Sequence, residues 1–339
     1  MTAAWAEAGV ELVAPGVHRV PLPLPNDGLR AVNVYVLETA TGLVLVDGGW
    51  AIPQAQQLLE SALSGLGATG HDIDRFLVTH VHRDHYTQAV EMRRAYGARV
   101  GLGARERPTL ELMLDDGVHT LELQMDLLRA YGAVELAELI AAGAGDLQVD
   151  LRSWEPPDDW LEPGVVALAG GRELEAVATP GHTTGHLVFH DLAGALLFAG
   201  DHVLPRITPS IGFEPVPHPN PLRAFLDSLT LMRRRPDALL LPAHGPVAPS
   251  VHARVDELVE HHGQRLAEMQ AVAAGRTLTA AEVAGQVRWT RRLTPYAELD
   301  PFNAMLATFE TGAHLELLAS QGSLTRTDEP AGDRVRRYG

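Results

Sequence analysis

The stretch Thr79–His85, THVHRDH, places three histidines and an aspartate within six positions of one another. It follows the residues RFLV, which are typical of a β-strand, and precedes YTQAVEMRRAYG, which is typical of a helix. Because side chains alternate along a strand, we expect His80 and His82 to project to the same face, where two imidazoles can bind one ion. Asp84 and His85 come after the expected end of the strand, so they can turn toward a second ion.

Three further segments carry metal-binding side chains just after predicted strands. His182 lies in TPGHTTGH, Asp201 ends LLFAGD, and His244 lies in LLLPAHG. A sheet brings the ends of its strands to one edge, where such side chains can share a pocket. As a carboxylate, Asp201 can bridge two cations. Other histidines, in the helical C-terminal sequence, are expected to face solvent: His252, His261 and His262.

The composition limits the classes of protein and partner. With 339 residues, the chain exceeds the roughly 250 to 300 at which one hydrophobic core usually stops growing, so we expect a main domain with an appendage. Lysine and arginine number 27 and acidic residues 43, and the net charge of -16 disfavours nucleic acid as a partner. There is no cysteine, so a metal must bind nitrogen and oxygen.

No feature of the sequence indicates a membrane or a secretory route. No apolar run approaches the roughly 20 residues that span a bilayer. The N-terminal MTAAWAEAGVELV has acidic residues and no cationic segment before an apolar stretch, unlike a secretory signal. We therefore expect a cytoplasmic protein without a membrane partner, and a homodimer is one candidate oligomeric state.

Strand-like and helical segments alternate through the first part of the chain. Strands are expected near 16–22, 32–38 and 42–47, and again in GVVALAG, ELEAVAT, HLVFHD, GALLFAGD and ALLLPAHG. Residues 105–145 contain two or three helices with no strand between them, which we interpret as a helical lid. These elements define a predicted catalytic domain over residues 1–250.

The remaining sequence is expected to be helical. A small domain, with a winged-helix arrangement as one option, is predicted over 251–325, and a disordered tail over 326–339. Thr279 followed by Glu282 is a capping-box signature for a short helix. A longer helix with a stop near Gly322 is expected to place four residues on one face: Leu306, Phe309, Ala313 and Leu317.

The metal-binding motifs resemble those of the metallo-β-lactamase-fold hydrolases, in particular the glyoxalase II-like branch. The His-x-His-x-Asp-His run, TPGHTTGH, AGDHV and PAHG match the family's motifs in the family's order. Asp47 in VLVDGG matches the acidic residue that the family has after an early strand. No cysteine stands at a metal position, which departs from the β-lactamases that use a thiolate ligand and makes penicillin a less favoured substrate.

The resemblance implies an α/β fold, a four-layer αββα sandwich with a dinuclear metal site at one edge. The first ion would be bound by His80, His82 and His182. The second would be bound by Asp84, His85 and His244, with Asp201 bridging the two. Asp84 is also the predicted catalytic residue.

Two residues are expected to act from behind these ligands. Asp47 would orient a ligating imidazole or the bound water, although an aspartate in a tight turn before Gly48 and Gly49 is an alternative interpretation. His202, next to Asp201, is a candidate proton donor, and a hydrogen bond to the scaffold is the alternative.

The predicted mechanism follows from the donors. A water shared by two divalent cations is acidified, so that a metal-bound hydroxide can attack a carbonyl whose oxygen is polarised by a cation. The cation also stabilises the charge that develops in the transition state. We expect zinc in both positions, with iron or manganese as alternatives for such a donor set.

The expected substrates are small acyl thioesters, esters or lactones. A metal-dependent endoribonuclease or phosphodiesterase is the alternative, and a β-lactamase or a non-catalytic binding module is less favoured. The arginines of RWTRR, residues 288–292, could hold glutathione or form a solvated helix face. Tyr86 could face the pocket or the core, and apolar lid residues such as Leu110 and Met125 could contact an acyl chain or simply pack.

Overall fold

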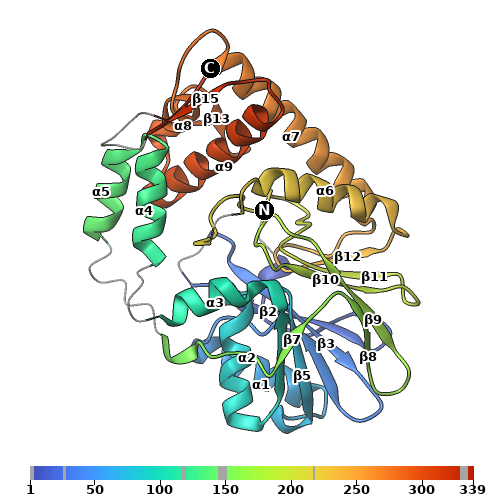
Figure 1. Ribbon diagram of the computed structural model, residues 1–339. Coiled ribbons are helices and arrows are strands. Elements are labelled where there is room, and N and C mark those ends of the chain that lie inside the picture. The colour runs from blue at the N-terminus through green and yellow to red at the C-terminus, as the bar shows by residue number, and fades with distance from the viewer. Residues whose placement is uncertain (1–3, 26–27, 116–119, 144–150, 217, 329–334) are drawn as a thin grey trace. The chain divides into compact units, whose positions relative to one another are not determined.

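The computed structural model describes most of the chain as an arrangement of two compact units (Figure 1). The described residues are 4–25, 28–115, 120–143, 151–216, 218–328 and 335–339. The sheet unit comprises Met1–Leu114, Asp150–Pro209 and Ser228–Asp256. The helical unit comprises Asp115–Val149, Ser210–Asp227 and Glu257–Gly339. All nine residues predicted to hold or support the metal ions therefore belong to the sheet unit.

The first sheet of the sheet unit has seven strands in sequence order. The first four pair antiparallel, and β4 to β7 pair parallel. Parallel neighbours need crossover connections, and α1 (Pro53–Gly65) and α2 (Arg83–Tyr96) supply two of them. The strands are β1 (Glu11–Ala14), β2 (Val17–Pro23), β3 (Ala31–Glu38), β4 (Leu43–Val46), β5 (Ile73–Val78), β6 (Arg99–Gly103) and β7 (Asp159–Leu161).

The second sheet has five strands in the order β12-β11-β10-β9-β8. Its neighbours pair antiparallel except β11 and β12, which are parallel. The strands are β8 (Gly164–Ala167), β9 (Glu173–Ala178), β10 (Leu187–Asp191), β11 (Leu196–Gly200) and β12 (Leu239–Pro242). Each strand expected from the sequence on either side of the helical insertion is therefore present.

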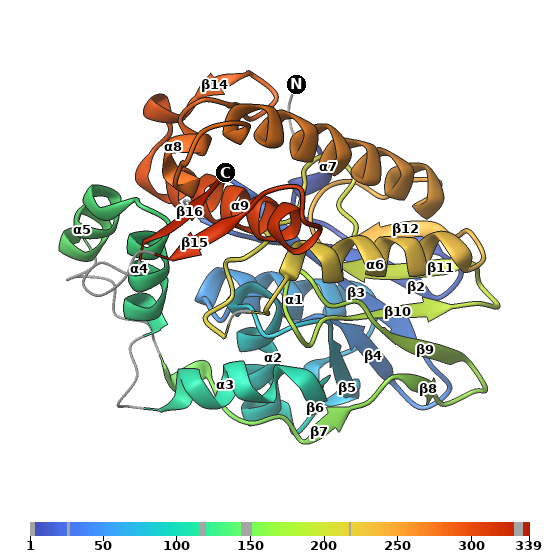
Figure 2. The same cartoon turned by 45° about the horizontal axis from the view of Figure 1, so that its top comes forward.

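Apolar side chains of the two sheets meet in one core. Tyr35 of β3 lies edge-to-face against Phe198 of β11, with ring centroids 5.4 Å apart. On the other face of the first sheet, Leu59 of α1 and Val90 of α2 pack into a second buried cluster with Phe76. The part of α6 (Pro221–Arg234) that belongs to the sheet unit, from Ser228 onward, runs along the second sheet (Figures 1 and 2). These layers confirm the predicted αββα sandwich.

The predicted insertion is helical where it is described. It contains α3 (Arg107–Leu114), α4 (Thr120–Ala130) and α5 (Val134–Gly143). Leu110 is 1% exposed in the core beneath α1 and α2, and Met125 is 2% exposed in the core of the helical unit. These two side chains serve packing.

The helical unit is built around α9 (Pro301–Ser320), which is buried along most of its length. Its core also receives residues from α4, α5, the C-terminal part of α7 (Val251–Ala273) and α8 (Ala280–Ala284). Of the four residues expected on one face of this helix, Phe309, Ala313 and Leu317 are buried and Leu306 is half-buried. The capping box of α8 is confirmed, since Thr279 Oγ1 accepts a hydrogen bond from the Glu282 amide and Glu282 Oε2 accepts one from the Thr279 amide.

Short strands also occur in this unit, in addition to the helices expected after residue 250. β13 (Arg288–Trp289) pairs with β14 (Thr294–Pro295), which also shows that RWTRR is not a helix face. β15 (Arg326–Asp328) pairs with β16 (Arg336–Tyr338). The predicted disorder of 326–339 is wrong for these two strands and otherwise falls largely outside the described residues.

The tail is ordered there because its last strand has a buried anchor. Tyr338 is 0% exposed, donates a hydrogen bond to Glu316 at 2.8 Å, and exchanges backbone hydrogen bonds with Leu278.

Folding of residues 1–250 and 251–325 as separate domains stays a prediction. Within the described residues, no helix is long and apolar enough to cross a bilayer. The short 3₁₀ helices are Ala4–Ala6, Gly70–Asp72, Ala104–Glu106, Leu151–Ser153 and Tyr296–Glu298.

Candidate metal centre

The seven predicted ligands come together at the edge of the two sheets where β5, β9, β11 and β12 end. His80 and His82 lie in the loop after β5, and Asp84 and His85 lie in the first turn of α2. The other three follow the second sheet's strands: His182 after β9, Asp201 after β11 and His244 after β12. Donors separated by up to 164 positions in the sequence thus converge on one site.

His80 and His82 do not extend a strand, as the sequence suggested, because β5 ends at Val78. The Thr79 amide donates to Asp47 Oδ1 at 2.8 Å instead of to a neighbouring strand. The chain therefore leaves the sheet one residue before the first ligand. The two imidazoles share a site because the loop turns them inward, and strand alternation plays no part.

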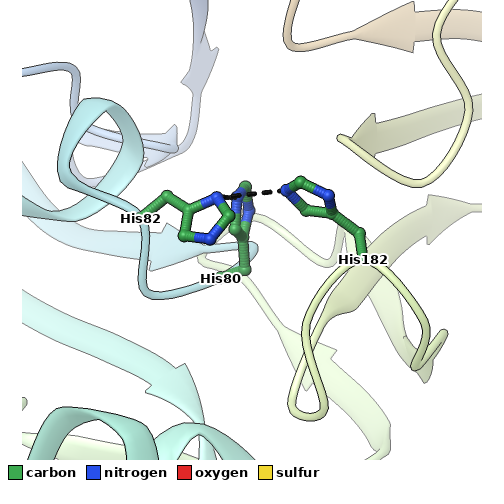
Figure 3. A group of neighbouring side chains, drawn as sticks. All are labelled: His80, His82 and His182. Atoms are coloured by element: carbon green, nitrogen blue, oxygen red, sulfur yellow. Dashed lines mark hydrogen bonds between the residues drawn. The ribbon is translucent and has the colours of Figure 1, made fainter. Parts of the chain in front are cut away.

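The first donor group consists of three imidazoles whose nitrogens face one another (Figure 3). His82 Nδ1 lies 3.0 Å from His80 Nε2 and 3.1 Å from His182 Nε2. Two ligands of a tetrahedral zinc ion lie roughly 3.3 to 3.4 Å apart when each Zn–N distance is about 2.0 to 2.1 Å. The spacing of these nitrogens is close to what a single ion would need.

The second donor group consists of Asp84, His85 and His244. Asp84 Oδ2 lies 3.6 Å from His85 Nε2 and 3.4 Å from His244 Nε2. Asp201 lies between the two groups. Its Oδ2 is 3.4 Å from His182 Nε2, whereas its Oδ1 is 3.4 Å from His244 Nε2 and 3.8 Å from His85 Nε2. One carboxylate therefore presents a different oxygen to each group.

Two hydrogen bonds fix which ring nitrogens are available to a ligand. His85 Nδ1 donates to Asp47 Oδ2 at 2.9 Å, and His244 Nδ1 donates to the Ala31 carbonyl at 2.8 Å. The opposite nitrogens, His85 Nε2 and His244 Nε2, are buried without a hydrogen-bond partner, and so is Asp201 Oδ1. These three polar atoms face one another without a hydrogen bond, and an ion bound between them would satisfy all three.

Asp47 holds the site together from behind. Besides binding His85, it accepts hydrogen bonds from the amide and the hydroxyl of Thr79, at 2.8 and 2.9 Å to Oδ1. It has a left-handed backbone, with φ of 62°, and the next residue, Gly48, comes so close to α2 that a Cβ would lie 2.6 Å from the Ala89 amide nitrogen. Asp47 therefore both forms the tight turn and accepts the hydrogen bond from His85.

Two imidazoles of the first donor group, His80 and His82, are uncharged in the absence of metal. Burial, together with the neighbouring histidines, lowers the pKa of His80 well below its ordinary value. Burial, followed by the effect of His182, lowers the pKa of His82 to about 3. Neutral imidazole is the form that binds metal, so protons do not compete for these two rings near pH 7.

The second donor group behaves differently because carboxylates surround it. Burial by itself lowers the pKa of His85. The carboxylates of Asp47, Asp84 and Asp201 outweigh burial and raise this pKa to about 10. Burial raises the pKa of Asp84, but His85 and His244 hold it below its usual range. In the metal-free protein, a protonated His85 therefore supplies positive charge that a metal ion would replace.

The structure assigns a role to a histidine that the sequence analysis passed over. His186, the second histidine of TPGHTTGH, is fully buried. Its Nδ1 lies 2.8 Å from Thr179 Oγ1, and its Nε2 accepts the Asp201 amide at 3.2 Å. Gly200 permits this contact, since a Cβ there would lie 2.7 Å from His186 Nε2. The repeated Gly-His spacing was the available signal.

Two other predicted residues lie in the scaffold. His202 is fully buried, hydrogen-bonds to the backbone of Ser228, and has a pKa lowered by burial to about 3. This is the scaffold interaction that the sequence left open as the alternative to proton donation. Tyr86 is also buried; its hydroxyl donates to the Glu155 carbonyl at 2.5 Å, and its ring stacks on Trp154. Tyr86 faces the core.

Comparisons with known proteins agree with this geometry. The metallo-beta-lactamase superfamily model matches residues 27–244, a range that includes all seven predicted ligands and Asp47. The beta-lactamase-like protein 2 homolog of Caenorhabditis elegans is 25% identical over 260 residues, which cover 76% of this chain and 71% of that protein. The atrochrysone carboxyl ACP thioesterase of Aspergillus novofumigatus is 27% identical over 268 residues, but the match spans only 65% of its length and 79% of this chain.

A solved structure extends the likeness to nearly the whole chain. A metallo-beta-lactamase family protein of Thermus thermophilus is 28% identical, with a TM-score of 0.74 over 96% of this chain and 98% of that one. None of these likenesses singles out the glyoxalase II-like branch. The matched family model covers more than half of the sequence and includes every predicted ligand, so the chain belongs to the metallo-beta-lactamase superfamily.

Proposed function

We propose that this chain hydrolyses small acyl thioesters, with esters and lactones as related substrates, using two divalent metal ions, both of them zinc. The observation that carries the proposal is the position of Asp201, whose two oxygens face the two donor groups separately. A carboxylate in this position suits a pair of ions better than a single one.

The substrate class rests on relatives. The chain is a hydrolytic enzyme of the metallo-beta-lactamase fold, and three of its fungal relatives are named atrochrysone carboxyl ACP thioesterase. Thioester hydrolysis also fits the donor set, because it needs an activated water and a polarised carbonyl but no thiol or serine nucleophile. The absence of cysteine from the sequence is consistent with this chemistry.

The chain's own residues would divide the work as follows. His80, His82 and His182 would hold one ion, and Asp84, His85 and His244 the other. When bound, the two ions would supply Lewis acidity, which activates water and polarises the substrate carbonyl. Asp201 would set the distance between the ions, and Asp47 would keep His85 in the orientation that presents Nε2.

Asp84 is the acidic ligand most open to solvent. Its side chain is 17% exposed, against 9% for Asp201, and the side chains of His85 and His244 are 0% and 2% exposed. The substrate would therefore approach from the side of Asp84. Its carboxylate is ionised at pH 7 and would accept a proton from the attacking water, which would give Asp84 a catalytic role besides binding.

A phosphodiester is the alternative substrate, because two cations can also clamp a phosphate. The net charge of -16 opposes binding of a polyanion such as RNA. We therefore rank acyl substrates first.

The test is an activity panel with and without metal. The purified protein would be stripped with a chelator, reloaded with zinc, and assayed on acyl thioesters, lactones, a β-lactam, bis(p-nitrophenyl) phosphate and RNA. We expect thioester turnover that disappears on chelation and returns with zinc. Turnover of phosphodiesters alone would overturn the substrate class, and full activity in a metal-free sample would overturn the mechanism.

A further inference from the structure

A second cluster of histidines lies in the helical unit, outside the site described above. His261 and His262 belong to α7, and His314 and Glu310 belong to α9, which lies beside α7 in this unit (Figure 2). The sequence predicted that His261 and His262 face solvent. This is wrong for His262, which is 0% exposed, because α7 packs against α9 at this position.

A chain of hydrogen bonds assigns the protons in this cluster. His314 Nδ1 lies 2.7 Å from the Glu310 carbonyl oxygen, which can only accept, so Nδ1 carries the proton and Nε2 is an acceptor. His262 Nδ1 lies 3.2 Å from His314 Nε2 and must then be the donor. The lone pair of His262 is left on Nε2.

That lone pair has no hydrogen-bond partner, although the ring is completely buried. Burial, followed by the effects of His314 and His261, lowers the pKa of His262 to about 2, so protonation does not satisfy Nε2 at neutral pH. A buried acceptor without a partner costs free energy, and a metal ion is one species that removes this cost.

Two further ligands stand beside His262. His261, His262 and Glu310 each offer one ligand atom, and the three atoms lie within 4.8 Å of one another. Consecutive residues on a helix diverge by roughly 100°, so Glu310 from the facing helix is needed to close the set. Phe225 lies edge-to-face against the His262 ring at 5.5 Å and gives the cluster an apolar side.

One positive charge acts against a cation here. Arg265 is close enough to lower the pKa of Glu310, which burial raises. The guanidinium is engaged elsewhere in part: Nη1 donates to Glu268 at 2.7 Å and the group lies over the Trp289 ring at 4.5 Å, whereas Nη2 is buried without a hydrogen-bond partner. The Glu310 carboxylate supplies negative charge on the side of the histidines.

We propose that the helical unit binds one divalent transition-metal ion through His262 Nε2, His261 and the Glu310 carboxylate. Two imidazoles and a carboxylate are the donor set of zinc sites. The anchoring of His262 through His314 to a backbone carbonyl is the kind of support that ligating histidines have in metalloproteins. This site is independent of the proposed hydrolase function and of the ions in the sheet unit.

The test counts bound metal in the full-length protein. Wild type, Glu310→Gln and His261→Ala would be stripped with a chelator, titrated with zinc chloride by calorimetry, and analysed by mass spectrometry for retained zinc. We expect each variant to lose one zinc equivalent relative to wild type and to keep its zinc-dependent hydrolytic activity. Glu260→Gln is the matched control, because Glu260 is an exposed carboxylate beside His261 outside the cluster, and it should retain all the zinc.

The two variants protect the test against misfolding. Glu310→Gln preserves side-chain size, and His261 is only half-buried, so at least one should fold with the circular dichroism spectrum of wild type. If the folded variants bind as much zinc as wild type with the same affinity, the helical unit has no metal site and the proposal is overturned.

Discussion

The histidines of the sheet unit and those of the helical unit are anchored alike but differ in charge. In both places a ring donates its Nδ1 proton to a fixed acceptor and leaves Nε2 unpartnered: Asp47 accepts from His85, and His314 accepts from His262. Three carboxylates make His85 cationic without metal, whereas His262 stays neutral. The hydrogen bond at Nδ1 fixes the direction in which Nε2 points. The surrounding charges decide whether a metal ion must displace a proton from that nitrogen.

The largest effect should come from removing a ligand in the sheet unit. Asp84→Ala should reduce kcat/KM by roughly 10²- to 10⁴-fold, because it removes a ligand and the proposed proton acceptor together. Zinc bound in the helical unit should not change. Steady-state kinetics and metal analysis would measure both quantities.

The control for Asp84→Ala is Asp74→Ala, which removes an exposed carboxylate from β5, the strand that precedes the ligand run. This control should be as active as wild type. Loss of activity in both variants, or retention in both, would contradict the role of Asp84.

A smaller effect is expected from loosening the anchor of His85. Asp47 accepts a hydrogen bond from His85 at one carboxylate oxygen and from the Thr79 amide at the other. In Asp47→Asn an NH2 group, which only donates, replaces one of these oxygens, so one of the two hydrogen bonds is lost. We expect zinc affinity in the sheet unit to fall about 10- to 100-fold, as is typical when a ligand loses its supporting hydrogen bond. Competition with a chromophoric chelator would measure the affinity, and excess zinc should restore most of the activity. Unchanged affinity would show that Asp47 serves only the turn.

The difference in charge between His85 and His262 predicts that zinc binding releases a different number of protons at the two sites. Zinc binding at His85 should release a proton at pH 7 to 8, because the pKa of about 10 keeps that ring protonated in the metal-free protein. Affinity there should rise about tenfold per pH unit for each proton released. Zinc binding at His262, whose pKa is about 2, should release none from that ring. Calorimetry of zinc binding in buffers of different ionisation enthalpy would separate the two events.

The same pKa predicts an alkaline weakness of the metal-free sheet unit. The pKa of His85 is raised in the folded state from its ordinary 6.5 to about 10, so its contribution to stability is complete below pH 6.5 and is lost as pH rises toward 10. Thermal melts of the stripped protein should therefore show a falling Tm between these values. Zinc-loaded protein should show a smaller decrease, and equal decreases would contradict the assignment of charge to His85.

The sequence was sufficient to predict which side chains gather at the edge of the two sheets, because they occur in short motifs. His80 to His85 lie in one run, and the other donors follow recognisable strands. The strand limits were harder to predict. β5 stops at Val78 because Asp47, 32 positions earlier, binds the Thr79 amide, and such a contact exists only once the loop has folded.

In the helical unit, the burial of two side chains could not be predicted from the local sequence. Nothing in the local sequence around His262 distinguishes it from the half-buried His252 and His261 of α7. Its burial depends on α9, a helix that contributes His314, 52 positions away. The sequence also predicts a disordered tail around Tyr338, because it has no apolar period there. The burial of Tyr338 depends on Glu316 and Leu278, which are distant in sequence.

The smallest effect should come from the part of the helical unit that the sequence predicted best. Thr279→Ala removes the hydroxyl that caps α8 and should destabilise the protein by about 1 kcal/mol, since the Glu282 amide loses its side-chain acceptor. Ser323→Ala, which removes an exposed hydroxyl in the same unit, should cost less. Chemical denaturation would measure both. Because Thr279 contacts neither histidine cluster in the described hydrogen bonds, zinc content and activity should not change. A change in either would show that the cap of α8 influences a metal site.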